Sequence, residues 1–379
     1  MTIRAILSGE KLDLRFSSYS DEGFKLIDSN GLYDDILLSS PLHLDNAFDE
    51  KTFDIFFLAK KDILESDIYQ VYDETRKTRI GWCIPVNALD STDHDYSSNI
   101  HFQKYAFAAI KNTLLNIDDS IFTKQLDIGL SFQIRLSDIL HPNTAILIIS
   151  RETLVANRAF EIECAMPSLI RHGYVRLSNI SPDEITLSGI KPENSKIQLK
   201  LISSDLSNHQ VIDSLLHSAF AYETKAILCF FYLYQIFELL LEEIYQNEQS
   251  KIVNELIIAA GDSSKAKDAL EKAQRISSEK KRIGLLTKEY SKSQEKLSNL
   301  KNSCNTLLKT IGRNEGKTFE EYFYSIRNFI FHQYRDFPID KEQLLKEVVY
   351  DVRDWLPDML SSFKKPIIML NGAKTATST

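Results

Sequence analysis

The chain has 379 residues, of which 43% are apolar and 26% are charged, and its formal net charge is −8. Because a compact domain usually holds about 150 residues, this length predicts two domains, and the composition excludes wholesale disorder, collagen and a coiled-coil rod. Every uncharged apolar stretch is far shorter than the roughly 20 residues that cross a bilayer, and residues 1–11 contain no secretory signal. We therefore expect a cytoplasmic protein that does not bind a membrane.

Residues 1–207 are expected to form a strand-rich mixed α/β domain, because short apolar runs alternate there with turn residues. Strands are predicted at Phe53–Leu58, Phe132–Leu136, Thr144–Ile149, Tyr174–Leu177, Ile185–Leu187 and Ile197–Ile202. Apolar residues at three- and four-residue steps predict an amphipathic helix over His101–Leu115. A meandering sheet covered by this helix is the simplest arrangement. Residues 1–210 carry 21 Lys and Arg against 30 Asp and Glu, and we expect this acidic half to sense or regulate.

One loop of this domain contains residue types that bind divalent cations. Asp90, Asp93, His94 and Asp95 lie close together in sequence, and His101 follows shortly after. Hard oxygen and imidazole ligands of this kind hold a metal in some proteins. Clusters of Asp, Ser and Thr are nevertheless common in turns, so a polar surface loop is the favoured interpretation and no metal site is predicted.

Residues 208–365 are expected to form an all-α domain. Large apolar side chains recur at helical spacing from Leu216 to Ile257, and no proline occurs between Pro192 and Pro338. Such a long segment without proline, rich in Lys, Glu and Leu, is typical of a helical bundle. Together with the first domain, this predicts an α+β fold.

A seven-residue apolar repeat runs through the middle of the second domain. Its members are Ile276, Ile283, Tyr290, Leu297, Cys304 and Ile311, with Glu279, Gly284 and Ser293 as interruptions. Because apolar heptads normally pack against another helix, we predict that residues 262–312 form a long coiled-coil-like helical segment. Residues 262–317 carry 14 Lys and Arg against 7 Asp and Glu, which predicts a basic outer face that attracts a polyanion.

The last predicted helix runs from Gln343 to Phe363. It follows Asp340, which begins a capping-box-like sequence, and its apolar residues have helical spacing. Residues 366–379 have the composition of a flexible tail.

Several sequence patterns typical of enzymes are missing. The segment from Gly312 to Thr318 has three residues between its glycines, where a phosphate-binding loop needs four, so Gly312 is expected to cap a helix. Neither a dinucleotide-binding, a nucleophile-elbow nor a zinc-protease motif occurs. The four cysteines are scattered and form no Cys-x-x-Cys pair, which disfavours disulfides and thiolate zinc sites. No cofactor is predicted.

The segment from Tyr322 to Arg335 holds the polar residues best suited to chemistry. On a helix that advances about 100° per residue, its aromatic and aliphatic side chains occupy one arc. The opposite arc carries Arg327, Asn328, His332 and Arg335. An arc of this kind is often only the solvated face of an amphipathic helix.

The pattern Arg327-Asn328-x-x-x-His332-x-Tyr334 resembles the Arg-x4-His-x-Tyr signature found in some HEPN domains. The aromatic helix predicted over Ala226–Tyr245 resembles the long early helix of that family, and the similarity covers about residues 209–363. The segment 262–312 makes this domain larger than a minimal HEPN bundle, either as an insertion or as an elongated pair of bundle helices. Many HEPN proteins are metal-independent ribonucleases of toxin, abortive-infection and other antiphage systems, so the resemblance implies an endoribonuclease.

The resemblance also implies a role for each motif residue. His332 would act as general acid or base, since histidine titrates near neutral pH. Arg327 would stabilise the charge that develops on the phosphorane, and Asn328 would hold the imidazole or a phosphate oxygen. Tyr334 and Arg335 are accessory candidates. Because about 140° separates Arg327 from His332 on a regular helix, and HEPN ribonucleases pair two motifs across a twofold cleft, the resemblance implies a homodimer with a composite site.

RNA is the expected partner, and Lys280, Lys281 and Arg282 of the basic segment are predicted to contact its phosphates without sequence preference. An antitoxin or a phage-derived trigger would be a further partner of a toxin or defence effector. The alternative is a non-catalytic HEPN-like module that binds a nucleotide or another protein, with the basic segment as an assembly device. The presence of Arg327, Asn328 and His332 together favours the enzyme.

Overall fold

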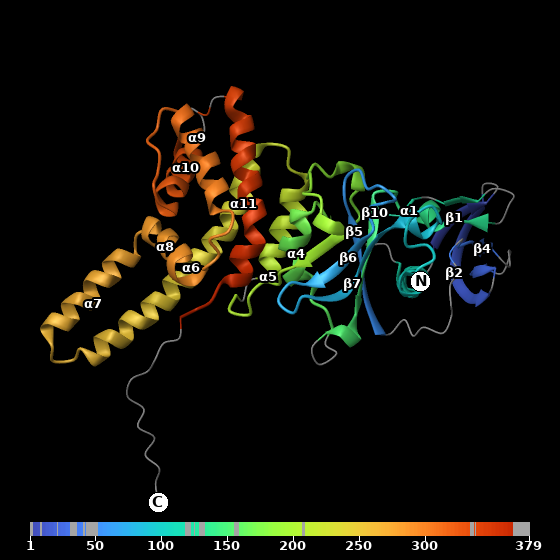
Figure 1. Cartoon of the computed structure of the whole chain (residues 1–379), viewed down its shortest axis with the longest axis horizontal. Coiled ribbons are helices and arrows are strands. Elements are labelled where there is room, and N and C mark those ends of the chain that lie inside the picture. Colours follow the sequence, from blue (N-terminus) through green and yellow to red (C-terminus); the bar gives the residue numbers. More distant parts are fainter. Residues whose placement is uncertain are drawn as a thin grey trace, which may run out of the picture. The chain divides into compact units, whose positions relative to one another are not determined.

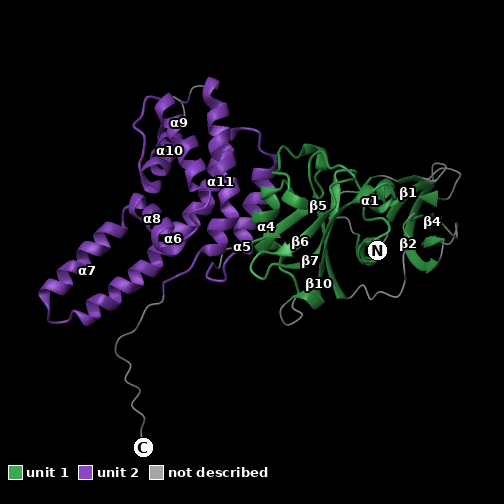
Figure 2. Cartoon of the chain, viewed as in Figure 1, with its two compact units in different colours: residues 1–200 green, residues 201–379 purple. Residues whose placement is uncertain are grey.

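The computed structural model describes residues 3–7, 10–20, 22–30, 36–40, 42, 52–117, 123–124, 126–128, 133–154, 159–206, 209–333, 337 and 339–366. The chain divides into two compact units, residues 1–200 and 201–379 (Figure 2). Unit 1 is rich in strands and unit 2 is helical, which confirms the predicted α+β class. The division falls close to the boundary that the sequence predicts at residue 207.

Unit 1 contains two six-stranded sheets, whose strand orders are β8-β1-β2-β3-β4-β9 and β11-β5-β10-β7-β6-β12 (Figure 1). The strands of the first sheet are β1 Ile3–Leu7, β2 Glu10–Ser20, β3 Gly23–Asp28, β4 Ile36–Leu38, β8 Leu126–Ile128 and β9 Gln133–Ile134. Those of the second are β5 Phe53–Ala59, β6 Tyr69–Asp73, β7 Thr78–Pro85, β10 Thr144–Ser150, β11 Val175–Arg176 and β12 Lys196–Leu199. The expected single meander is therefore wrong. Strands β1 to β4 follow one another as antiparallel neighbours, and so do β6 and β7, whereas β8, β9 and β12 each pair in parallel with a strand distant in sequence.

The predicted helix of unit 1 is confirmed as α2, Ile100–Asn116, which contacts strands of both sheets. The Asn99 side chain caps it by accepting hydrogen bonds from the backbone N–H groups of His101 and Phe102, at 3.0 and 3.1 Å. Its apolar face, including Phe102 and Phe107, belongs to the core cluster that the two sheets share. Burial of such an amphipathic face, more than helix propensity, stabilises a helix of this length.

Four of the predicted strands overlap with β5, β10, β11 and β12, although the structure ends β12 at Leu199 and limits β11 to Val175–Arg176. At Phe132–Leu136, the strand β9 is limited to Gln133–Ile134, because the helix α3, Leu136–Ile139, begins there, and Phe132 lies outside the described residues. Ile185–Leu187 forms no strand. Its apolar side chains are buried directly after the 3-10 turn Pro182–Glu184, so their apolar character reflects burial in a loop.

Polar side chains of the loop around Asp90 form hydrogen bonds with backbone groups of neighbouring segments. The Asp90 carboxylate accepts hydrogen bonds from the N–H groups of Leu136 and Ser137 at 3.1 and 2.7 Å, which caps α3. His94 Nε2 lies 3.0 Å from the carbonyl oxygen of Ala88. Within the described ranges, no three His, Cys, Asp or Glu side chains gather as metal ligands would.

Unit 2 consists of helices α5 His209–Ser214, α6 Ala226–Ile258, α7 Ser263–Ile276, α8 Glu279–Leu285, α9 Leu297–Thr310, α10 Phe319–Gln333 and α11 Glu342–Ser362. Phe237 of α6 lies at the centre of the bundle, with its ring centre 4.6 Å from that of Phe323 in α10 and 6.1 Å from that of Trp355 in α11. Beyond the bundle, α6 and α7 run side by side as an antiparallel hairpin (Figure 1). None of the described helices combines the length and apolar composition needed to cross a bilayer.

The prediction of one long coiled-coil-like helix over 262–312 is wrong. The segment forms α7, α8, a π-helical turn at Leu286–Tyr290 and α9, with breaks at Ser277-Ser278 and at residues 291–296. The second break is held to α11, because Ser291 Oγ donates to the carbonyl of Met359 at 3.1 Å and Lys296 Nζ lies 2.9 Å from Asp358 Oδ2. The heptad residues Ile276, Ile283, Tyr290 and Cys304 are buried, but by different neighbours. Regular spacing of buried positions does not require one continuous helix.

Both predicted helix ends in the C-terminal region can be compared with the structure. Gly312 has φ +73° and follows α9, with the N–H of Gly312 bonded to Lys309 and that of Arg313 to Leu308, so the predicted C-cap is confirmed. The helix α11 matches the predicted span, but its N-cap is Lys341 and the expected capping box does not form. Residues 367–379 of the predicted tail lie outside the described residues.

Candidate active site

The helix α10 carries the motif and is held by its apolar side. Phe319, Phe323, Ile326 and Ile330 of this helix are buried. The helix α8 packs antiparallel to it, with Glu279 beside Arg327 and Gly284 beside Glu320. A Cβ atom on Gly284 would lie 3.1 Å from the Glu320 carboxyl carbon, so the glycine permits the close approach of the two helices.

Arg327, Asn328 and His332 meet within one chain. Arg327 Nη1 lies 3.2 Å from Asn328 Oδ1 and 3.2 Å from His332 Nε2. The long arginine side chain bridges the angular separation that the helix imposes. A guanidinium only donates hydrogen bonds, so the contact with the imidazole forms when Nε2 carries no proton. His332 is exposed and Arg327 is half-buried, which leaves the imidazole open to a ligand.

Three further residues surround Arg327, and none of them was predicted as a site residue. Arg327 Nε lies 3.3 Å from Glu279 Oε1, close enough for an ion pair although the N–H is not aligned for a hydrogen bond. The guanidinium carbon lies 5.5 Å from the ring centre of Tyr234 and 4.9 Å from that of Phe331. Tyr234 also donates a hydrogen bond to Glu279, and burial, followed by this bond, raises the pKa of its hydroxyl. The only sequence signal was the charge of Glu279 within an apolar repeat.

The three residues predicted to contact RNA differ in their surroundings. Lys280 and Lys281 are exposed and line a pocket of about 400 Å³. Arg282 donates from Nη1 to the carbonyl oxygens of Ile276 and Ser277 at 2.8 and 3.0 Å, and thus caps the end of α7. Its guanidinium also lies over the ring of Tyr245. Arg282 therefore joins α7 to α8, whereas the two lysines project from the surface.

The two accessory candidates, Tyr334 and Arg335, lie outside the described residues. An apolar patch of α6, formed by Leu228 and Phe231, lies beside the motif. These side chains are 38% and 40% exposed, and the Phe231 ring centre lies 5.5 Å from that of Phe331.

Comparisons with known proteins add no relative: no family model, no curated protein and no solved structure matches this chain.

The ion pair between Arg327 and Glu279 should contribute measurably to stability. Glu279→Gln keeps the shape of the side chain but removes its charge, and we expect it to lower the free energy of unfolding by about 1 kcal/mol. In a unit of this size that change lowers the melting temperature by roughly 2–4 °C. Differential scanning fluorimetry measures it. Glu289→Gln is the matched control, because Glu289 is exposed on the same segment; equal melting temperatures for the two variants would contradict the prediction.

Proposed function

We propose that this chain is a HEPN-type endoribonuclease that needs no metal ion and acts as a toxin or antiphage effector in the cytoplasm. One observation carries the proposal: Arg327 Nη1 lies 3.2 Å from both Asn328 Oδ1 and His332 Nε2, beside an exposed imidazole. A cationic donor, an amide and an acid–base group are thus gathered at one place. These are the groups that cleavage of a phosphodiester by the neighbouring 2′-hydroxyl requires.

In the proposed reaction, the imidazole of His332 takes the proton of the 2′-hydroxyl. The 2′-oxygen then bonds to phosphorus, and the bond from phosphorus to the 5′-oxygen breaks. Arg327 faces the charge that develops on the non-bridging oxygens, and Asn328 orients the imidazole or a phosphate oxygen. The leaving 5′-oxygen takes a proton from a second acid, a role that His332 of a second protomer would fill in a composite site. The products are a 2′,3′-cyclic phosphate and a 5′-hydroxyl.

A cleavage assay tests this function. The purified protein is incubated with single-stranded RNA and with tRNA in excess EDTA, and the product ends are identified by their response to phosphatase and kinase. We expect cleavage that resists the chelator and leaves 2′,3′-cyclic phosphate ends. Activity that disappears with EDTA, or products with 3′-hydroxyl ends, would rule out the proposed chemistry.

We expect the protein to form a homodimer through unit 2, with the α6 patch near the contact. Leu228 and Phe231 expose apolar surface beside the motif, and covering it with a second copy would bring two motifs together. Light scattering should give twice the chain mass at micromolar concentration, and Phe231→Glu should shift the protein towards monomer and reduce cleavage. Val253→Glu is the control, since Val253 is 50% exposed on the same helix but distant from the motif. A monomer that cleaves RNA would contradict the composite site.

A non-catalytic interaction or nucleotide-binding module is the second candidate, and one observation favours it. Glu279, Tyr234 and Phe331 surround Arg327, as they would surround an arginine that only packs. Expression in a bacterial host separates the two functions. An enzyme that acts as a toxin should slow growth, and His332→Ala should restore it. If the chain is a non-catalytic module, this substitution should leave the growth rate unchanged. If the chain is a toxin or defence effector, we propose that the acidic unit 1 is the place where a trigger or an antitoxin acts.

A further inference from the structure

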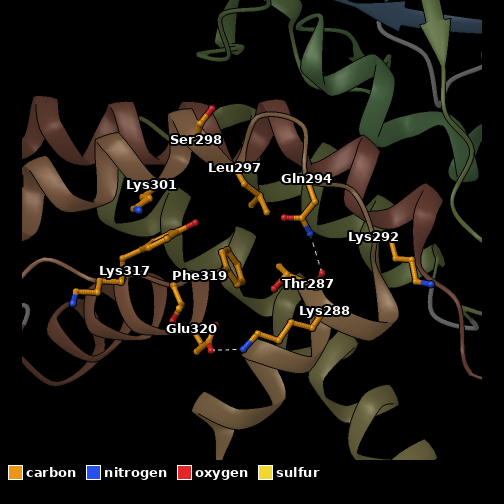
Figure 3. Close-up of a pocket in the computed structure, with 12 residues that line it drawn as sticks. Thr287, Lys288, Lys292, Gln294, Leu297, Ser298, Lys301, Lys317, Phe319 and Glu320 are labelled. Atoms are coloured by element: carbon orange, nitrogen blue, oxygen red, sulfur yellow. Dashed lines mark hydrogen bonds and ion pairs between the residues drawn. The ribbon is translucent and has the colours of Figure 1, made fainter.

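A pocket of about 590 Å³ lies apart from the motif, at the opposite end of α10 (Figure 3). Its walls come from the π-helical turn Leu286–Tyr290, the break before α9, the first turns of α9 and the start of α10. This volume is within the range of about 300–1,000 Å³ that is typical of small-molecule sites. No function discussed above uses this pocket.

The pocket is strongly basic. Lys288, Lys292, Lys301 and Lys317 surround it, against the single carboxylate of Glu320 (Figure 3). These lysines come from separate segments of the chain, so the fold has gathered them.

Lys288 neutralises the carboxylate, with its Nζ 2.6 Å from Glu320 Oε1. Burial raises the pKa of Glu320, but hydrogen bonds from Lys288, the backbone and Thr318, together with the charge of Lys288, hold this pKa below its usual value. Within the described part of the chain, the side chains of Lys292, Lys301 and Lys317 have neither an ion pair nor a hydrogen bond. Three positive charges are left for a ligand.

Side-chain hydrogen bonds hold the backbone around the pocket in place without a ligand. The Asn305 side-chain amide accepts from the N–H of Gly316 at 2.9 Å and donates to its carbonyl oxygen at 3.0 Å. Glu321 Oε2 accepts from the N–H of Lys317 at 2.8 Å. On the opposite wall, Gln294 Nε2 donates to the carbonyl oxygen of Thr287 at 3.1 Å. A preorganised wall lowers the ordering cost of binding.

We propose that this pocket binds phosphate groups. Ammonium groups are strongly hydrated point charges that suit phosphate oxygens. Figure 3 shows Lys292 on one side of the pocket and Lys301 and Lys317 on the other, which favours a ligand whose several negative charges are spread along its length. The phosphates could belong to an RNA strand or to a free polyphosphate such as a nucleotide. For RNA, the inference deepens and rests on the proposed function: Glu320 and Arg327 lie about two helical turns, or about 10 Å, apart along α10, so one strand can contact both places.

Binding is tested in the full chain that carries His332→Ala, so that loss of binding is measured separately from loss of cleavage. Lys292, Lys301 and Lys317 are replaced together by Gln. The matched control replaces Lys267, Lys309 and Lys346 by Gln. These are exposed lysines of unit 2 outside the pocket, so the control removes the same amount of charge. Fluorescence anisotropy then measures the affinity for a labelled single-stranded RNA, and calorimetry measures the affinity for inorganic tripolyphosphate and ATP.

We expect the pocket variant to bind RNA at least about tenfold more weakly than the control variant, with a salt dependence reduced by about two in log–log slope, because each lost phosphate contact removes about 0.7. Both variants should melt like the parent protein. If the tripolyphosphate and ATP affinities fall while RNA binding does not, the site takes free polyphosphates. If the pocket and control variants bind RNA, tripolyphosphate and ATP equally, the pocket is not a phosphate site.

Discussion

His332→Ala should lower the rate of RNA cleavage by a factor of about 10² to 10⁴, the usual contribution of a positioned acid–base group. The imidazole is exposed and contacts Arg327 Nη1 at 3.2 Å, so its removal should leave the fold unchanged. Single-turnover cleavage of a labelled RNA measures the effect. His101→Ala is the matched control, because His101 is also an exposed histidine in a helix, and it should cleave like the parent protein.

Arg327→Ala should reduce cleavage by a factor of about 10² to 10³, as expected when a donor to developing charge is lost. Because Arg327 also packs against Tyr234 and Phe331, the melting temperature of the variant must be measured as well as its activity. Arg327→Lys keeps a positive charge near Glu279 but loses the planar fork, and it separates the two roles. If both His332→Ala and Arg327→Ala cleave at the parental rate, the HEPN mechanism is wrong and the binding-module function becomes the better proposal.

Gly316→Ala should cost about 3 kcal/mol of stability, the upper part of the range for overpacking a tight site. A Cβ atom there would lie 2.4 Å from the backbone nitrogen of Tyr322, and a backbone atom in a helix cannot move aside cheaply. The corresponding fall in melting temperature is roughly 6–12 °C. Calorimetry of the full chain would show it.

Gly312→Ala provides the comparison for that prediction. Gly312 has φ +73° but nothing within 4 Å of its Cβ position, so the substitution meets only the backbone strain of about 1–2 kcal/mol. The decisive result is which of the two variants has the lower melting temperature. A Gly316→Ala protein that melts above Gly312→Ala would contradict the close packing of the loop against α10.

The sequence by itself determined the features that depend on local periodicity. Apolar spacing predicted α2 and α11, and the glycine after α9 predicted its cap. Near residue 207, short apolar runs separated by turn residues give way to apolar residues at helical spacing, and this change predicted two units and the α+β class. The same spacing placed Arg327, Asn328 and His332 on one face of α10. These features are decided by residues within a few helical turns, so one chain segment contains the information.

The tertiary structure alone decided which distant segments meet. The pairing of β8, β9 and β12 in two sheets, and the breaks within 262–312, depend on partners far away in sequence. The same holds for the contact of Glu279 with Arg327 and for the gathering of four lysines around one pocket. An apolar or charged residue has the same local pattern whichever neighbour buries or pairs it. Only the packing of α8, α9 and α10 selects that neighbour, because it fixes the distance between their side chains.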